Sequence, residues 1–425
     1  MNCMNIKEKI ATANKEAVSN IVNSEPFWVD IKPAIEVIEG MEDHMILHSG
    51  PPITYENMVD LHKRGMQNAA LTEGWASTRE EAIAMLESGE IKLESALDHN
   101  TVGAGTGIIT KSLAMMVTED RATGKIAANI PMEGDYLGGL CAWGRYSPEI
   151  VENLRYMRED VFPYIVELLK KLGGVSIKPI LAEGMQMGDE NHTRQDAAGM
   201  ILLQKLASEI VKMRWGQERT EMVMHYIADT PRMFHPMGMG ACRSAMLSNV
   251  GKPYSTMVTA MGGNGVEFGL KIAALGDQWF TAPAPKLDGQ YTSSKFSEKD
   301  ALPWIGDSCI TECAGLGGMA AATSPMVTYI LGKKLHEAIN QTKEMTKICI
   351  GKNNNFPIPN LDFDFLPVGI DMRMVLKTGI CPTMHGGNFH VDGGLIGAGT
   401  ARAPMECFEK ALRAYADKYA EEAKA

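Results

Sequence analysis

The sequence has few of the features that mark secreted or membrane-spanning proteins. Its 425 residues include only eight cysteines and 7% aromatic residues. Cysteines this sparse do not build a disulfide scaffold, so we expect a reducing compartment, the cytoplasm. The first twenty residues lack the apolar core of a signal peptide. The uncharged run at residues 313–332 consists mainly of Gly, Ala, Ser and Thr, which is too weakly apolar to insert into a membrane.

The chain also has fewer basic residues than acidic residues. The chain has 41 Lys and Arg against 52 Asp and Glu, a formal net charge of −11. An acidic surface repels phosphate backbones and anionic lipids, so we expect neither nucleic acid nor a membrane as partner. Glycine and methionine are abundant, at 42 and 30 residues. They indicate many tight turns, sites lined by backbone, and an adaptable core or assembly surface.

Hydrophobic patterning predicts a mixed α/β fold (α+β), with two α/β domains and a small helical domain between them. Strand and helix signals alternate in the first third, and helical periodicity dominates the middle third after Ser147 and Pro148, which suit a helix N-terminus. Mixed signals then return, and Pro404 opens a terminal helix. We therefore expect an N-terminal α/β domain, a helical domain, and a C-terminal α/β domain ending in a helix, at residues 1–146, 147–250 and 251–425.

The glycine-rich stretch at residues 393–404 is the strongest local signal. Glycines let backbone N–H groups approach an anion, and a following helix adds the positive end of its dipole. Gly397, Gly399, Thr400 and Arg402 are therefore candidate ligands of a phosphate or carboxylate. The alternative is a close-packed turn with a structural arginine.

Three further segments offer polar groups beside glycines. A loop after a predicted strand places His99, Gly103, Gly105 and Thr106 together, and a position at the end of a strand is a usual place for a site. His48 lies at another strand-to-helix junction, and Asn264 lies in a predicted turn at residues 262–265. Each could equally be structural.

Glu190 and His192 are candidates for proton transfer, because a carboxylate and an imidazole meet here at a predicted helix start. The alternative is that the acidic residues only cap that helix. His385, His390 and Asp392 match no strong zinc pattern, and Cys309 and Cys313 are not spaced as C-x-x-C. We therefore expect no metal and no cofactor.

Eight segments, in order along nearly the whole chain, resemble the YlbE-like family, which includes the AllG-type subunit of bacterial oxamate carbamoyltransferase. They are LHSGPP (47–52), EGWA (73–76), HNTVGAGTGIIT (99–110), AEGMQMGDENHTR (182–194), TAMGGNGVEFG (259–269), LGDQWFTAP (275–283), GDSCITECAGLGG (306–318) and IGAGTARAPMECFEKAL (396–412). The resemblance implies two unusual α/β domains with a small helical domain, in agreement with the patterning.

The resemblance also implies an activity. Oxamate and carbamoyl phosphate would interconvert with oxalurate and phosphate in allantoin (purine) catabolism, in a complex with an FdrA-type subunit and a third protein. The Ser-Thr-Arg-Thr phosphate motif of ordinary carbamoyltransferases is absent. Under this activity His48 or His99 would stabilise the carbamoyl oxygen, Glu190 or His192 would act as base, and Arg402 would bind an anion. The alternatives are a non-catalytic scaffold or regulatory subunit, and another acyl or phosphoryl transferase for a small anion.

Overall fold

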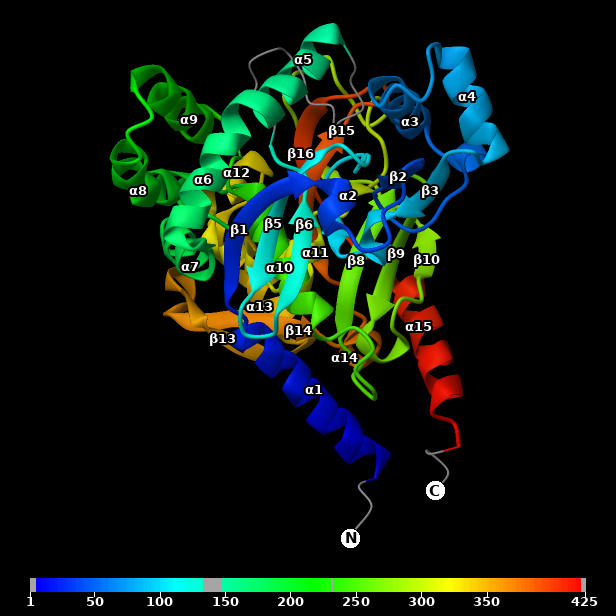
Figure 1. The fold of residues 1–425 in the computed structure, drawn as a ribbon. Helices are drawn as coiled ribbons and strands as arrows, with labels where there is room; N and C mark the ends of the chain where they lie inside the picture. The colour runs from blue at the N-terminus through cyan, green and yellow to red at the C-terminus, as the bar shows by residue number, and fades with distance from the viewer. Residues whose placement is uncertain (1–4, 133–146, 231, 422–425) are drawn as a thin grey trace.

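The computed structural model describes residues 5–132, 147–230 and 232–421 (Figure 1). Helices and strands are mixed along the chain, which confirms the predicted α/β class. Both ends of the chain lie on the same side, where the N-terminal helix α1 (Ile6–Asn23) and the C-terminal helix α15 (Met405–Lys418) project (Figure 1). No described helix has the length and apolar character needed to cross a membrane.

A five-stranded sheet organises the N-terminal part. Its order is β4 (Thr101–Val102), β6 (Lys125–Asn129), β5 (Ala114–Asp120), β1 (Pro26–Pro33) and β7 (Val175–Ser176). Beside it, a parallel pair carries two helices; these elements are β2 (Met45–His48), β3 (Lys92–Ser95), α3 (Asp60–Thr72) and α4 (Arg79–Ser88). A short helix, α2 (Ala34–Val37), follows β1.

The middle of the chain is helical, as predicted. It contains α5 (Pro148–Tyr156), α6 (Phe162–Leu172), α7 (Lys178–Gln186), α8 (Asp196–Lys212), α9 (Gln217–Asp229) and α10 (His235–Leu247). The Ser147 side chain accepts a hydrogen bond from the Ile150 N–H at 3.3 Å, which confirms the predicted N-cap. Helix α10 packs against β5 and β6, so the helical segment contacts the first sheet directly.

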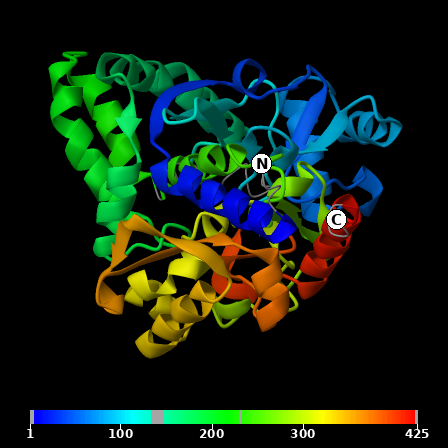
Figure 2. The same cartoon turned by 90° about the horizontal axis from the view of Figure 1, so that it is seen from below.

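Three antiparallel sheets make up the last third. The first has the strand order β10 (Phe280–Pro283), β9 (Glu267–Ile272), β8 (Val258–Asn264) and β12 (Ile305–Gly306). The second has the order β11 (Asp288–Tyr291), β16 (Leu395–Arg402) and β15 (Thr383–Phe389). The third pairs β13 (Cys349–Ile358) with β14 (Asp364–Ile370). Their helices are α11 (Ile310–Cys313), α12 (Pro325–Ile330), α13 (Leu335–Thr346), α14 (Met372–Thr378) and α15. Figure 2 shows α1 lying across this part, where it contacts β13, β14 and α10.

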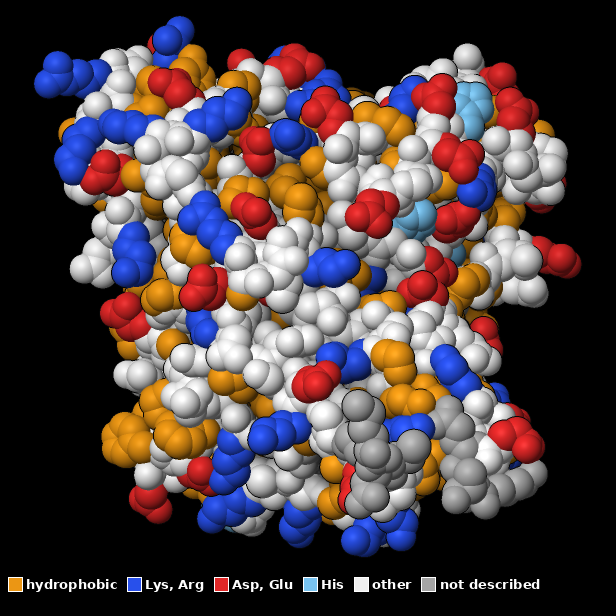
Figure 3. Space-filling view, turned by 60° about the horizontal axis from the view of Figure 1, so that its bottom comes forward, with side chains coloured by type: hydrophobic (Ala, Val, Ile, Leu, Met, Phe, Trp, Pro, Cys, Tyr) orange, Lys and Arg blue, Asp and Glu red, His pale blue; other side chains and the backbone are white. Residues whose placement is uncertain are grey.

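One hydrophobic core joins the three segments. Trp28, Phe234 and Phe268, one from each predicted domain, are fully buried members of the same cluster. Residues of all three predicted segments thus share one core, while the division into domains near residues 146 and 250 stays a prediction. On the face shown in Figure 3, acidic and basic side chains are interspersed despite the net negative charge.

Two predicted glycine turns are in fact strands. Residues 395–402 form β16, paired with β11 and β15, so the predicted anion loop at 393–404 is wrong as a loop. A Cβ at Gly397 would lie 2.2 Å from the Gln290 carbonyl oxygen, so the glycine is needed for sheet packing. Likewise β8 runs through Asn264, which leaves no four-residue turn at 262–265.

Candidate active site

Ser308, His192 and Glu312 form a continuous line of hydrogen bonds. The Ser308 Oγ lies 2.8 Å from His192 Nε2, and His192 Nδ1 lies 2.8 and 2.9 Å from the two oxygens of Glu312. Because the carboxylate accepts a hydrogen bond from Nδ1–H, Nε2 is left as the acceptor for the serine hydroxyl. This is the order of groups in serine–histidine–acid catalytic triads.

Glu312 lies in α11 and is completely buried. Three hydrogen-bond donors besides His192 hold its carboxylate in place. Its carboxylate accepts hydrogen bonds from the Thr311 hydroxyl at 2.9 Å, the Gly318 N–H at 2.8 Å and the His385 N–H at 3.1 Å. A Cβ at Gly317 would lie 2.1 Å from a Glu312 oxygen, so only glycine leaves room for this carboxylate. A buried carboxylate with this many donors has a fixed orientation.

His192 sits in the turn between α7 and α8, and Glu190 holds that turn. The Glu190 carboxylate accepts hydrogen bonds from the backbone N–H groups of His192 and Arg194 at 3.0 Å and also from that of Thr193. Its neighbour Asp189 caps α8 through the Ala198 N–H at 2.8 Å. Glu190 therefore holds the turn that positions the imidazole. This is a structural role, of the kind that the alternative interpretation gives to the acidic residues of this segment.

The charge of Glu312 sets the protonation of His192. Burial opposes a charged imidazole, but the coulombic attraction and hydrogen bond of Glu312 outweigh it and raise the pKa of His192 above its usual value. Among the described residues, no acid raises the pKa of the neighbouring His235. Burial, followed by the charges of His192 and Arg232, holds the pKa of His235 well below its usual value, so this imidazole is neutral.

The Ser308 side chain opens into a pocket with about 510 Å³ of empty space including its mouth. All three predicted domains line it. The lining residues are Ala104, Gly105, Met132, His192, Thr193, Arg232, His235, Ser308, Gly386, Gly387, Phe389 and Leu395. His192 is 3% exposed and Glu312 0%, whereas Ser308 is partly exposed. Only the hydroxyl end of the triad is therefore open to a ligand.

Arg232 brings a positive charge to this pocket. Within residues 5–132, 147–230 and 232–421, its guanidinium makes no hydrogen bond or ion pair, and Glu190 and Asp196 attract it only at longer range. Its backbone adopts φ +56°, a left-handed conformation that costs energy for a residue other than glycine. An unpaired guanidinium in a recessed pocket is a binding group for a carboxylate or phosphate.

Of the residues predicted from sequence, His192, Glu190 and Gly105 lie at this site. His99 does not, because its ring bonds the Glu39 carbonyl at 2.6 Å and the Glu94 carboxylate at 2.8 Å. His48 is buried elsewhere, with Nδ1 2.9 Å from the Ser49 carbonyl, and burial lowers its pKa. These two histidines occupy structural positions.

The other residues that the sequence suggested as anion ligands make hydrogen bonds within the fold. Gly103 donates its N–H to Asp307 at 3.1 Å. The Thr106 carbonyl accepts from His62 Nε2 at 2.8 Å, and Asn264 accepts the Glu267 N–H at 2.8 Å. None of these three residues lines the pocket of Ser308.

The predicted ligands on β16 are also paired within the fold. Arg402 donates to the Cys381 carbonyl at 2.8 Å and forms an ion pair with Glu344 at 2.5 Å. Thr400 accepts a hydrogen bond from Lys333 Nζ at 3.1 Å. Gly399, like Gly397, packs against β11. Residues 397–402 therefore present no free anion cradle.

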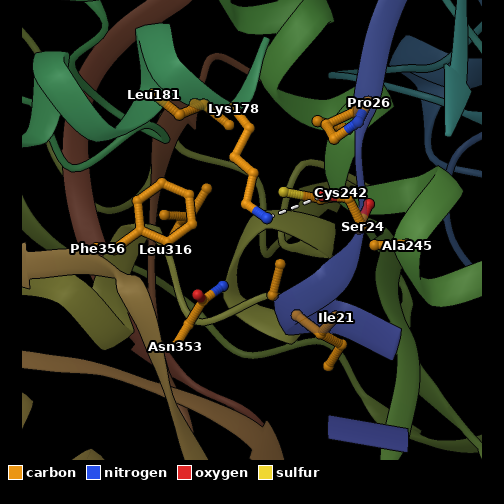
Figure 4. A pocket seen from close by; sticks show the side chains of 12 residues that line it. Ile21, Ser24, Pro26, Lys178, Leu181, Cys242, Ala245, Leu316, Asn353 and Phe356 are labelled. Carbon is orange, nitrogen blue, oxygen red and sulfur yellow. Dashed lines mark hydrogen bonds between the residues drawn. The ribbon is translucent and has the colours of Figure 1, made fainter. Parts of the chain in front are cut away.

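A second cavity, between α1, α7 and α10, contains the thiol of Cys242, and burial raises the pKa of this thiol, which leaves it in the unreactive protonated form (Figure 4). Apolar side chains dominate its lining, among them Ile21, Leu181 and Phe356. Lys178, its one cation, donates to the carbonyls of Val22 and Ser24 at the end of α1. Its ammonium group is thus occupied by hydrogen bonds to carbonyl groups at the C-terminus of a helix. In the part of the chain that the structure describes, no group of three or more His, Cys, Asp or Glu could hold a metal ion.

Sequence reasoning missed Ser308, Glu312 and Arg232. Ser308 and Glu312 are 116 and 120 residues from His192, and such distances leave no local pattern. One signal was present: Glu312 is the sole charged residue of the sequence between Asp307 and Lys333, a stretch otherwise rich in Gly and Ala. A charge inside a buried segment needs partners, which is a reason to look for a site.

Comparisons with known proteins agree on one family. The sequence model of oxamate carbamoyltransferase subunit AllG matches residues 91–308. The uncharacterized protein YahG of Escherichia coli K12 is 35% identical, over 97% of this chain and 88% of its own length. Oxamate carbamoyltransferase subunit AllG of the same strain is 35% identical, over 96% and 98%. A solved structure, of a conserved protein of unknown function from Enterococcus faecalis V583, has a TM-score of 0.92 at 33% identity and covers 97% and 99% of the two chains.

Proposed function

The chain belongs to the family of oxamate carbamoyltransferase subunit AllG, and on this premise we propose that it is the substrate-binding, catalytic subunit of a carbamoyltransferase complex. The proposed reaction interconverts oxamate plus carbamoyl phosphate and oxalurate plus phosphate. In allantoin catabolism in the cytoplasm it runs as phosphorolysis of oxalurate. The observation that carries the proposal is the Arg232 guanidinium, which has no hydrogen-bond or ion-pair partner among the described residues and lies in the same pocket as the Ser308–His192 pair.

The pocket meets the two chemical demands of this reaction. Oxamate, oxalurate and phosphate are anions, and a guanidinium binds a carboxylate or phosphate with two parallel hydrogen bonds. The oxamate nitrogen loses a proton when it attacks the carbamoyl carbon and regains one in the reverse direction. His192, with a pKa raised by Glu312, is suited to carry that proton.

The family name describes a subunit, so partners belong to the proposal. We expect this chain to work with an FdrA-type subunit and a third protein, and the isolated chain to be less active than the complex. Size-exclusion chromatography with light scattering on co-expressed proteins tests the assembly. Separate elution of the chains at micromolar concentration contradicts it.

The comparisons are also compatible with a second class of substrate. YahG, which has no named reaction, is as similar to this chain as AllG is, at 35% identity. A transferase for another small carbamoylated anion is therefore the second candidate. A panel of such anions, assayed for phosphate-dependent cleavage beside oxalurate, separates the two.

The test of the site uses two arginines in the co-expressed complex. Arg232→Lys keeps the charge but loses the forked geometry, and Arg232→Ala loses both. We expect Arg232→Ala to lower kcat/KM for oxalurate phosphorolysis about tenfold or more, the equivalent of a charge-assisted hydrogen bond of about 1.5–3 kcal/mol. Arg232→Lys should fall between this variant and the wild type.

Arg402→Ala is the matched control, because Arg402 is paired with Glu344 outside the pocket. Circular dichroism and melting temperature establish that each variant is folded. Wild-type kinetics in folded Arg232→Ala, together with a loss in Arg402→Ala, would move the substrate to β16 and overturn the proposal.

A further inference from the structure

We infer that Ser308 is a covalent catalyst that accepts the carbamoyl group on its Oγ, so that the transfer proceeds through a carbamoyl-serine intermediate. The inference rests on the proposed function and deepens it, because it assigns the chemical route. Its basis is the juxtaposition of an accessible hydroxyl, a buried imidazole and a buried carboxylate in one hydrogen-bonded line.

The partners of Ser308 distinguish it from serines with structural roles. Ser147 and Ser324 accept backbone N–H groups at helix starts, and Ser95 donates to the Gly50 carbonyl. The Ser308 hydroxyl caps nothing among the described residues, and His192 Nε2 is its partner there. A hydroxyl bonded to a base and facing a pocket is an activated nucleophile.

The direction of the line favours removal of the serine proton. Glu312 accepts a hydrogen bond from Nδ1–H, which leaves Nε2 as the basic nitrogen, and its charge stabilises the imidazolium that forms. Because Glu312 is also held by Thr311, Gly318 and His385, it cannot turn away when the imidazole becomes charged.

The first half-reaction balances with groups in the pocket. The Ser308 Oγ attacks the carbamoyl carbon of oxalurate, and its proton passes to His192 Nε2. The tetrahedral adduct collapses by breaking the bond between the carbamoyl carbon and the oxamate nitrogen. His192 returns the proton to that nitrogen, so oxamate leaves as the amide and the carbamoyl group remains as an ester of Ser308.

Phosphate completes the cycle. A phosphate oxygen attacks the carbamoyl carbon of the serine ester, the bond to Oγ breaks, and Oγ recovers a proton from phosphate through His192. Carbamoyl phosphate leaves, and the free enzyme returns. Arg232 offers positive charge to the oxamate carboxylate in one half-reaction and to phosphate in the other. One binding site thus serves both anions in turn.

This route predicts exchange reactions that a direct transfer does not allow. With phosphate absent, the complex should exchange labelled oxamate into oxalurate. With oxamate absent, it should exchange labelled phosphate into carbamoyl phosphate. Acid quench of the complex with labelled oxalurate, followed by peptide mass spectrometry, should find the carbamoyl group on Ser308.

Variants separate the covalent route from the pocket itself. Ser308→Ala should lower both exchanges by about a hundredfold or more. Ser308→Cys keeps a nucleophile and should retain a measurable carbamoyl adduct. Ser324→Ala removes a helix-capping serine outside the pocket and should leave both exchanges unchanged.

The outcomes distinguish the two levels of the argument. If Ser308→Ala impairs net transfer but the wild-type complex shows neither exchange nor adduct, the covalent step is wrong and the proposed function stands. If folded Ser308→Ala and Arg232→Ala both keep wild-type transfer, the proposed function fails as well. Exchange in the wild type that survives in Ser308→Ala assigns the intermediate to another group and overturns the inference.

Discussion

Two buried carboxylates lie on either side of Ser308, and they have opposite roles. Asp307 accepts backbone N–H groups of Gly50 at 2.7 Å and Gly103 at 3.1 Å, and so ties together two loops of the N-terminal part. Glu312 accepts a hydrogen bond from the His192 imidazole, whose other nitrogen contacts Ser308 at the pocket. Burial is the same for both, at 0% exposure. A buried acid is thus a functional candidate when its partner leads to a ligand, and a structural one when its partners are backbone.

The largest effect is expected for Glu312→Gln. The amide carries no negative charge to stabilise the imidazolium, and its NH2 group can donate to Nδ1 and favour the wrong tautomer, so we expect kcat for oxalurate phosphorolysis to fall roughly a thousandfold or more. In the wild type, His192 must be neutral to accept the serine proton, so activity should rise with pH around a midpoint above 6.5, the usual pKa of the group. Loss of Glu312 should lower that midpoint. A pH profile of kcat/KM that Glu312→Gln leaves in place contradicts the assigned role.

The second prediction concerns Asp307 and pH. Burial raises the pKa of Asp307 to about 7, above its unfolded value of 3.8. The folded state therefore holds this proton more tightly, and the stabilisation is complete below about pH 4 and lost as pH rises through 7. The difference in unfolding free energy between the wild type and Asp307→Asn should shrink over this interval by up to about 4 kcal/mol. Urea unfolding at several pH values measures it. A difference that grows with pH would refute the raised pKa.

The third prediction is the stability cost of Asp307→Ala. Both backbone N–H groups lose a buried acceptor, so we expect a loss of about 2–3 kcal/mol in unfolding free energy. Activity per folded molecule should remain far above that of Glu312→Gln. The midpoint of urea unfolding and kcat below it provide the comparison. Equal losses of kcat in the two variants would erase the distinction between the two acids.

The smallest effect is expected for Arg402→Ala. Its ion pair with Glu344 is about half exposed on the arginine side, at 47%, and such pairs contribute about 0–1 kcal/mol. The melting temperature should therefore change little, and the kinetics should not change. A large rise in KM for oxalurate would place an anion at β16 instead of at Arg232.

The comparison also explains which features could be predicted from the sequence. Helix starts at Thr78 and Ser147 and helix ends at Gly89 and Gly173 were predictable, because caps depend on a few adjacent residues. The glycines of β16 were not, because a glycine that admits a neighbouring strand and one that admits an anion have the same local signature. The sequence favoured His192 and Glu190, which share one turn.

The remaining site groups could not be read from local pattern. Ser308 and Arg232 become functional only through contacts made by the tertiary fold. Two of the segments that resemble the family, residues 182–194 and 306–318, contain the candidate site residues His192, Ser308 and Glu312. The resemblance did not distinguish Asp307 from Glu312, because both acids lie in the same resembling segment.

The long chain distance between the reacting groups has a consequence for how this molecule gains and loses its site. Bringing Ser308 against His192 closes a loop of 116 residues, and the entropy of that closure is recovered only by the shared core around Trp28, Phe234 and Phe268. The triad is therefore a product of the whole fold and cannot survive in a fragment. In a denaturant titration, catalysis and the near-ultraviolet signal of the buried tryptophans Trp28 and Trp304 should disappear together, which makes the activity itself a gauge of global folding.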